Sequence, residues 1–278
     1  SSIDSIVSDQ YDRNLQNIDS AEAYQTISSL HCGKSTAVTD TGFSCDGVDS
    51  YLDMIQSAVE FMPNKNQTKF IREVNNQFVL LQGPPGTGKT AGSIAHTICS
   101  RIYDKQSSQD QLVGLVSGAS NKSIDEVLED VVSLRQQWID QDLGPELTNT
   151  KLIRLTKNAP SEQLPGVTYL HYRDEEKVER LQDQLTASAG ETLTPTNVVI
   201  FSTPFTLTKA IYSFPKLSNI VKSTPNITAF DFIVVDEASM MPCPQFFTLI
   251  KFFSPPGQVF ISGDHRQMAP VQKQDWTE

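Results

Sequence analysis

The stretch LLQGPPGTGKT, from Leu80 to Thr90, decides the fold class of this 278-residue chain. Gly83, Gly88, Lys89 and Thr90 match the pattern G-x-x-x-x-G-K-[ST], which is typical of phosphate-binding loops. Glycines there allow backbone angles at which successive N–H groups point at phosphate oxygens. The apolar run QFVLLQ precedes the loop and the helix-like run KTAGSIAHTICSRIY follows it. A strand, a loop and a helix in this order predict a nucleotide-binding loop rather than a chance match in a tight turn.

The predicted loop residues are Gly83, Pro84, Pro85, Gly86, Thr87, Gly88, Lys89 and Thr90. We expect Lys89 to reach the β- and γ-phosphates of the nucleotide. The hydroxyl of Thr90 is expected to bind Mg²⁺ at the start of the next helix, whose N-terminus also favours anions.

Further short β-branched runs follow along the chain: LVGLVS (112–117), KLIRL (151–155), NVVIF (197–201), FIVVDE (232–237) and QVFIS (258–262). Helical patterns lie between most of them. Short apolar strands that alternate with helices predict an α/β fold, with a mostly parallel sheet flanked by helices and right-handed crossovers.

The composition divides the chain into two parts. We expect an N-terminal accessory segment at 1–63 and a domain at 64–278 that carries the phosphate loop, with an insertion at about 157–195 that holds a charged helix candidate. Within the first part, Leu15 to Leu30 and Tyr51 to Phe61 have weak helical patterns. The Ser-, Thr-, Gly- and Asp-rich residues 31–50 predict a loop or a short hairpin.

Charge and hydropathy exclude several classes of protein. The net charge of −11 argues against a protein that coats nucleic acid through a basic surface, although a local cationic groove stays possible. No apolar run is long enough for a membrane span, and the N-terminus is polar and acidic, unlike a signal peptide. We therefore expect an intracellular protein, cytoplasmic or nuclear, without a membrane partner.

The run FIVVDEAS supplies a second site. Asp236 and Glu237 stand at the end of an apolar strand, where α/β sheets bind ligands. Asp236 can hold Mg²⁺, and Glu237 can deprotonate an attacking water. An acidic turn is the simpler interpretation of either residue alone, but the phosphate loop favours a catalytic pair.

The run VFISGDHRQMAP follows the last apolar strand. Gly263 allows a close turn, and Gln267 is a side chain that can contact a γ-phosphate or the attacking water. His265 alone is more typical of an ordinary turn, and a polar turn is the simpler interpretation of each residue taken singly.

Together, QGPPGTGKT, VVDEAS and GDHRQMAP resemble motifs I, II and III of superfamily 1 helicases, in the Upf1-like branch. NKNQ (64–67) is similar to the Q motif, and SGASNKSIDEVLE (117–129) is similar to motif Ia. VVIFSTPFTL (198–207) stands where motif Ib lies. The resemblance covers about residues 64–275. It departs from the family where SGASN lacks the usual proline and where QMAP replaces QLPP.

The resemblance implies a P-loop NTPase with a RecA-like domain that uses ATP and Mg²⁺ to translocate on single-stranded RNA or DNA, 5′ to 3′. It implies that Gln67 reads the adenine edge, that Gly263 lies in the ATP site and that Gln267 senses the γ-phosphate. It also implies nucleic-acid contacts by Ser120, Asn121, Ser202 and Thr203. Ser120 or Asn121 is equally suited to cap the helix that follows, and a helix N-terminus can do both.

The family needs a second RecA-like domain, whose arginine finger closes the ATP cleft and is worth about 10³–10⁵ in rate. No second strand-loop-helix phosphate unit occurs in the 278 residues, so we expect that domain to be absent from this chain. The chain alone is then expected to bind ATP weakly and to hydrolyse it slowly.

Two other interpretations stay open. One is an ATP-dependent switch or scaffold that does not unwind nucleic acid, which the acidic charge favours slightly. The other is a nucleotide kinase or GTPase, against which the absence of an N-K-x-D base-reading motif argues.

Overall fold

The computed structural model describes residues 41–56, 62–84, 86–105, 111–141, 143, 150–157, 160–171, 174, 176–177, 197–213, 223–224, 227–228, 230–264 and 266. Pro85, His265, Gln267 and the helical pattern at 15–30 therefore lie outside the described residues, as does most of the charged helix candidate.

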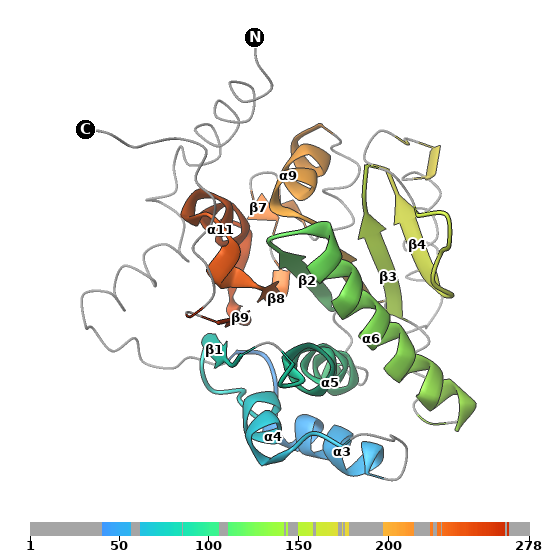
Figure 1. Ribbon diagram of the computed structural model, residues 1–278, viewed down its shortest axis with the longest axis vertical. Coiled ribbons are helices and arrows are strands. Elements are labelled where there is room, and N and C mark those ends of the chain that lie inside the picture. Colours follow the sequence, from blue (N-terminus) through green and yellow to red (C-terminus); the bar gives the residue numbers. More distant parts are fainter. Residues whose placement is uncertain are drawn as a thin grey trace, which may run out of the picture.

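A seven-stranded sheet forms the centre of the described molecule, and every neighbouring pair of strands is parallel (Figure 1). In spatial order the strands are β1 (Phe78–Gln82), β9 (Phe253–Gly263), β8 (Phe230–Asp236), β2 (Val113–Gly118), β5 (Asn197–Phe201), β3 (Thr150–Leu155) and β4 (Val167–Leu170). A small antiparallel pair, β6 (Ser223–Thr224) and β7 (Ile227–Thr228), forms a second sheet. The predicted α/β fold with a parallel sheet is confirmed.

Helices cover both faces of the sheet. On one side of the sheet, one core is shared by α3 (Cys45–Ile55), α4 (Lys65–Ile71), α5 (His96–Lys105) and α6 (Asn121–Asp140). The core on the other side includes α9 (Pro204–Ser213) and α11 (Cys243–Ile250). Alternate residues of β8 show the division, because side chains of a strand point to opposite faces. Phe232 and Val234 belong to the first core, and Ile233 and Val235 to the second.

The six apolar runs that predicted strands all form strands of this sheet. β4, by contrast, was not predicted. It lies within 157–195, and Val167 pairs with Leu152 of β3 in parallel register. Only Leu170 of this strand is fully buried, so β4 lacks the continuous apolar run that marks the inner strands.

The prediction of a loop or hairpin at 31–50 is wrong for residues 45–50, which belong to α3. The side chain of Ser44 caps this helix by accepting a hydrogen bond from Gly47 N. The buried residues Val48, Tyr51, Leu52 and Ile55 recur at helical spacing, but polar residues around them hide the stripe in the sequence.

Contacts join α3 to α5, the helix that follows the phosphate loop. The phenol oxygen of Tyr51 lies 2.7 Å from Nδ1 of His96, and burial lowers the pKa of His96 to about 4. The Ser44 backbone N–H donates to Asp104 at 3.2 Å. The described end of the predicted accessory segment thus packs into the same core as the sheet.

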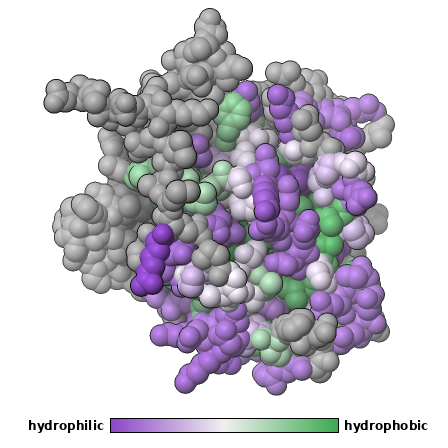
Figure 2. All heavy atoms as spheres, viewed as in Figure 1, coloured by the Kyte–Doolittle hydropathy of each residue, from purple (hydrophilic) through white to green (hydrophobic). Residues whose placement is uncertain are grey.

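The described surface in the view of Figure 2 is mostly hydrophilic, with small separate apolar patches. Among the described helices none has the length and apolar character that crossing a membrane requires.

Candidate nucleotide and nucleic-acid site

The phosphate loop leaves the carboxyl end of β1 and enters a helix. Gly86 and Gly88 have φ of 77° and 71°, which a side chain would disfavour, so glycine is needed at both positions. The helix opens as the π-helical stretch η2 (Thr90–Ala95) and continues as α5. The predicted helix is therefore present, but its first turns are wider than α, a feature that occurs often at functional sites.

Lys89 is buried, and its ammonium lies inside the loop. It donates hydrogen bonds to the carbonyl oxygens of Gly83 and, at 3.2 Å, Pro84. The hydroxyl of Thr87 closes the same turn by donating to the Pro84 carbonyl at 2.8 Å. Backbone carbonyls of the loop thus bind the Lys89 ammonium. Phosphate oxygens of a nucleotide can replace these carbonyls as its hydrogen-bond partners.

Gln67 supports the loop from the helix α4. Its Oε1 accepts from the backbone N–H of Asn64 at 2.7 Å, as part of the capping box of that helix. Its Nε2 donates to the Gly88 carbonyl at 3.1 Å. Gly92 lies against this amide so closely that a Cβ there would be 2.3 Å from Nε2. The predicted reading of adenine by Gln67 stays a prediction.

Asp236 is the last residue of β8, and Glu237 follows it at the same edge. Asp236 is 2% exposed, and burial raises its pKa to about 6, although Lys89 acts in the opposite direction. The nearby Ser262 hydroxyl also lowers this pKa, yet neither Asp236 Oδ1 nor Ser262 Oγ completes a hydrogen bond of normal geometry with a described residue. Glu237 has φ of 52°, a left-handed conformation that costs a non-glycine residue about 1–2 kcal/mol.

Gly263 brings β9 between the phosphate loop and the acidic pair. Its carbonyl accepts from Gly83 N at 3.3 Å. A Cβ on Gly263 would lie 3.1 Å from the backbone nitrogen of Ser239, which follows Glu237 in the turn η3 (Ala238–Met240). The Ser239 hydroxyl accepts from Asp264 N at 3.3 Å. The loops that follow the adjacent strands β1, β9 and β8 therefore pack against one another.

The oxygens at this edge fit a divalent cation. Asp236 Oδ1 and Glu237 Oε2 are buried without a hydrogen-bond partner among the described residues. Burying such oxygens is costly unless something satisfies them, and carboxylate and hydroxyl oxygens are the ligands that Mg²⁺ prefers. Asp236, with the hydroxyl of Thr90, is thus chemically suited to hold Mg²⁺ beside a phosphate.

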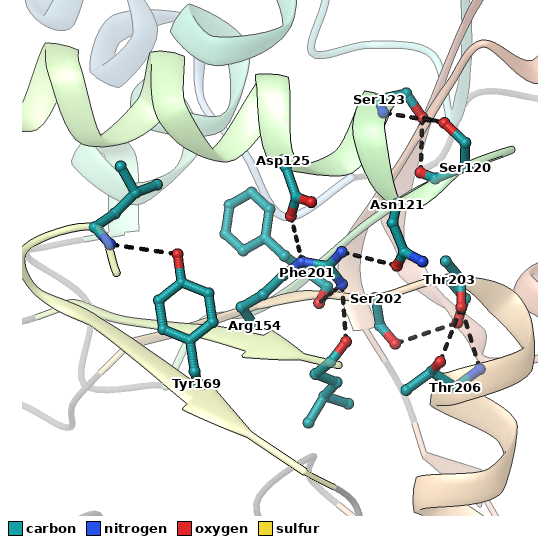
Figure 3. Close-up of polar contacts among 12 residues, drawn as sticks. Ser120, Asn121, Ser123, Asp125, Arg154, Tyr169, Phe201, Ser202, Thr203 and Thr206 are labelled. Atoms are coloured by element: carbon teal, nitrogen blue, oxygen red, sulfur yellow. Dashed lines mark hydrogen bonds and ion pairs between the residues drawn. The ribbon is translucent and has the colours of Figure 1, made fainter. Parts of the chain in front are cut away.

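The four residues predicted to contact nucleic acid lie together after β2 and β5, further along the same sheet edge (Figure 3). Ser120 caps α6 by accepting from Ser123 N at 3.1 Å, which confirms the capping interpretation. Thr203 accepts from Thr206 N at 3.3 Å at the start of α9. Ser202 is fully buried, and its hydroxyl donates to the Thr203 carbonyl at 3.2 Å.

Arg154, which sequence reasoning missed, joins these two groups. Its guanidinium is 2% exposed and donates to Asp125 Oδ1 at 2.6 Å and to Asn121 Oδ1 at 2.9 Å. It also donates to the carbonyl of Phe201, the residue before Ser202, at 3.4 Å. The signal in the sequence is a single arginine among the apolar residues of KLIRL, which alone does not say what it binds.

Comparison with known proteins gives one family and two relatives. A family model described as "AAA domain" matches residues 67–273. The human 3'-5' exoribonuclease HELZ2 is 25% identical over 252 residues, which cover 76% of this chain and 8% of that protein. The DNA polymerase alpha-associated DNA helicase A of Saccharomyces cerevisiae is 22% identical over 271 residues, which cover 81% of this chain and 38% of that protein.

The chain thus spans well under half the length of either relative. The family match and both relatives support the resemblance to Upf1-like superfamily 1 helicases that the motifs indicate.

Proposed function

The chain belongs to the AAA domain family, and from that premise we propose that it binds and hydrolyses ATP to move along single-stranded RNA or DNA, 5′ to 3′. The observation that carries the proposal is the strand order β1-β9-β8. This order places the phosphate loop, Gly263 and the Asp236–Glu237 pair at one edge of the sheet, where parallel sheets bind ligands.

Each group at this edge has a task in the proposal. The loop N–H groups and Lys89 bind the β- and γ-phosphates, and Thr90 with Asp236 holds Mg²⁺. When bound, the cation neutralises charge on the phosphates. Glu237 accepts the proton of the attacking water, since its carboxylate reaches the same edge and Oε2 has no described partner. Gln67 and Gln267 are proposed to contact adenine and the γ-phosphate.

The names of the two relatives support a nucleic-acid track, because one is a DNA helicase and the other an exoribonuclease. We propose that this chain works as the first RecA-like domain, with residues 1–63 as an accessory segment and 157–195 as an insertion. A second RecA-like domain is proposed to complete the cleft and to supply the arginine that stabilises the transition state.

Binding of a fluorescent ATP analogue, with and without Mg²⁺, tests the site in this chain. We expect Lys89→Ala to weaken binding by at least about tenfold, because it removes a charge-assisted contact to phosphate. Glu237→Gln should bind the analogue like the wild type and lose hydrolysis. Equal affinity of Lys89→Ala and wild type would refute the nucleotide site.

Turnover tests the motor. The chain alone is expected to hydrolyse ATP slowly, and the protein that also carries the second domain should respond to poly-RNA or to single-stranded DNA. Robust nucleic-acid-stimulated turnover by the 278 residues alone would contradict the need for that domain. Stimulated turnover without separation of a tailed duplex would favour the nucleotide-dependent switch instead.

A further inference from the structure

The side chain of Asn121 has only one possible orientation at Arg154. A guanidinium can donate hydrogen bonds but cannot accept them. The atom of Asn121 that lies 2.9 Å from Arg154 Nη2 is therefore the carbonyl oxygen. The other end of the amide, the Nδ2 with its two N–H donors, points away from Arg154 in Figure 3, on the side where Thr203 is drawn.

Arg154 is itself held from several sides. Its Nε donates to Asp125, one turn along α6, and its Nη1 donates to the carbonyl oxygens of Leu155 at 2.8 Å and Phe201 at 3.4 Å. A buried guanidinium with partners on β3, β5 and α6 has little freedom to rotate. The position of the Asn121 amide thus depends on three elements that are far apart in the sequence.

The side chain of Asn121 is exposed at the N-terminus of α6, beside the exposed Ser120 and Lys122. The Ser120 hydroxyl caps the helix, and the exposed Lys122, which pairs with Glu126 at 3.7 Å, adds a positive charge next to it. This surface therefore presents N–H donors and a cation, which suit acceptor oxygens such as those of a phosphodiester backbone.

We infer that Arg154 is a positioning residue that turns the Asn121 amide so that its nitrogen donates to a backbone oxygen of single-stranded nucleic acid. The inference rests on the proposed function, which it deepens by naming the donor and the residue that orients it. Arg154 also fixes the end of β5 beside Ser202, so that the loops after β2 and β5 form one surface.

Asn121→Asp separates this role from a structural one. An aspartate at this position keeps an oxygen for Arg154, so the folded structure should keep its stability. It loses the N–H donors and places a negative charge where the phosphate is expected. We expect binding of fluorescein-labelled single-stranded oligonucleotides, with RNA and DNA arms, to weaken about 10- to 100-fold. Binding of the ATP analogue should not change.

Ser133→Asp is the matched control. Ser133 is exposed on the same helix, about 18 Å along its axis from Asn121, and this variant adds the same charge. It should weaken oligonucleotide binding less than about twofold at moderate salt, because exposed charges beyond a Debye length are screened.

Arg154→Lys tests the orientation of the Asn121 amide. Lysine keeps a charge but cannot hold four partners in a planar fork, so oligonucleotide binding should weaken about five- to twentyfold. The double variant Arg154→Lys with Asn121→Asp should be no weaker than Asn121→Asp alone, because the donor is already gone.

If Asn121→Asp or folded Arg154→Lys binds the oligonucleotides like the wild type, the inference is overturned while the proposed function stands. If the wild-type chain binds neither RNA nor DNA, both are overturned, and retained ATP binding would then favour the switch.

Discussion

Replacing Asp236 by asparagine should stabilise the nucleotide-free protein, although it removes the residue proposed to hold Mg²⁺. Asp236 is 2% exposed, and burial raises its pKa from 3.8 to about 6. A pKa rise of about two corresponds to roughly 3 kcal/mol of folding free energy. Asparagine has the same shape without the charge that burial disfavours, so the variant should recover an amount of this order at neutral pH.

The sign follows from proton binding. The folded state holds the Asp236 proton more tightly than the unfolded state, so this group favours folding at pH values below 4. That contribution is lost as the pH rises from about 4 through about 6. The variant has no such proton. The difference in free energy of unfolding between variant and wild type should therefore grow across this interval and level off above it.

Denaturant unfolding at a series of pH values from about 4 to about 8 measures the difference directly. Asp53→Asn, at an exposed position of α3, is the matched control and should show no comparable gain. Mg²⁺ with a non-hydrolysable ATP analogue should stabilise the wild type much more than Asp236→Asn. The reasoning fails if Asp236→Asn is less stable than the wild type at neutral pH, or if the two have the same pH dependence.

Three further substitutions test the fold around the site by denaturant unfolding. Gly114→Ala should destabilise the protein by at least about 2 kcal/mol, because its Cβ would lie 2.1 Å from the ring of Phe232; an unchanged midpoint would contradict this packing. Glu237→Gly should raise the free energy of unfolding by up to about 1 kcal/mol, since it relieves the left-handed conformation at φ of 52°, and a clear loss would refute the strain. Arg101→Met should lower the free energy of unfolding by about 3 kcal/mol or more. The buried guanidinium donates hydrogen bonds to Gln258 Oε1 at 2.9 Å and to backbone carbonyls of the segment before β1, and an unchanged stability would refute their importance for the fold.

Local patterns predicted much of the fold and placed the candidate site residues at strand ends. The apolar runs marked the strands because strands buried on both faces need continuous apolar residues. The phosphate loop could be recognised because its glycines, lysine and threonine each have a separate task in binding phosphate and its metal ion. β4 and the first part of α3, residues 45–50, were not predicted, because β4 is only partly buried and polar residues dilute the apolar stripe of α3. The weak helical pattern that begins at Tyr51 covers the rest of α3.

Arg154 could not be assigned from the sequence, because its partners Asp125, Asn121 and Phe201 stand 29 to 47 residues away on other elements. The sequence supplies an arginine in an apolar strand, and only packing decides whether such a group meets a carboxylate, an amide or a carbonyl. The orientation of the Asn121 amide follows from the same packing, so it too lies beyond local pattern.

The sequence by itself determined that this protein has a parallel α/β sheet with a phosphate loop and an acidic pair at strand ends, because hydrophobic periodicity and residue chemistry are local properties. Only the tertiary structure decided that β9 inserts between β1 and β8, and that Arg154 joins the loops after β2 and β5. The order of strands and the partners of a buried charge depend on contacts between distant segments. Because the apolar runs of the strands are chemically similar, the sequence alone does not say which of them pair.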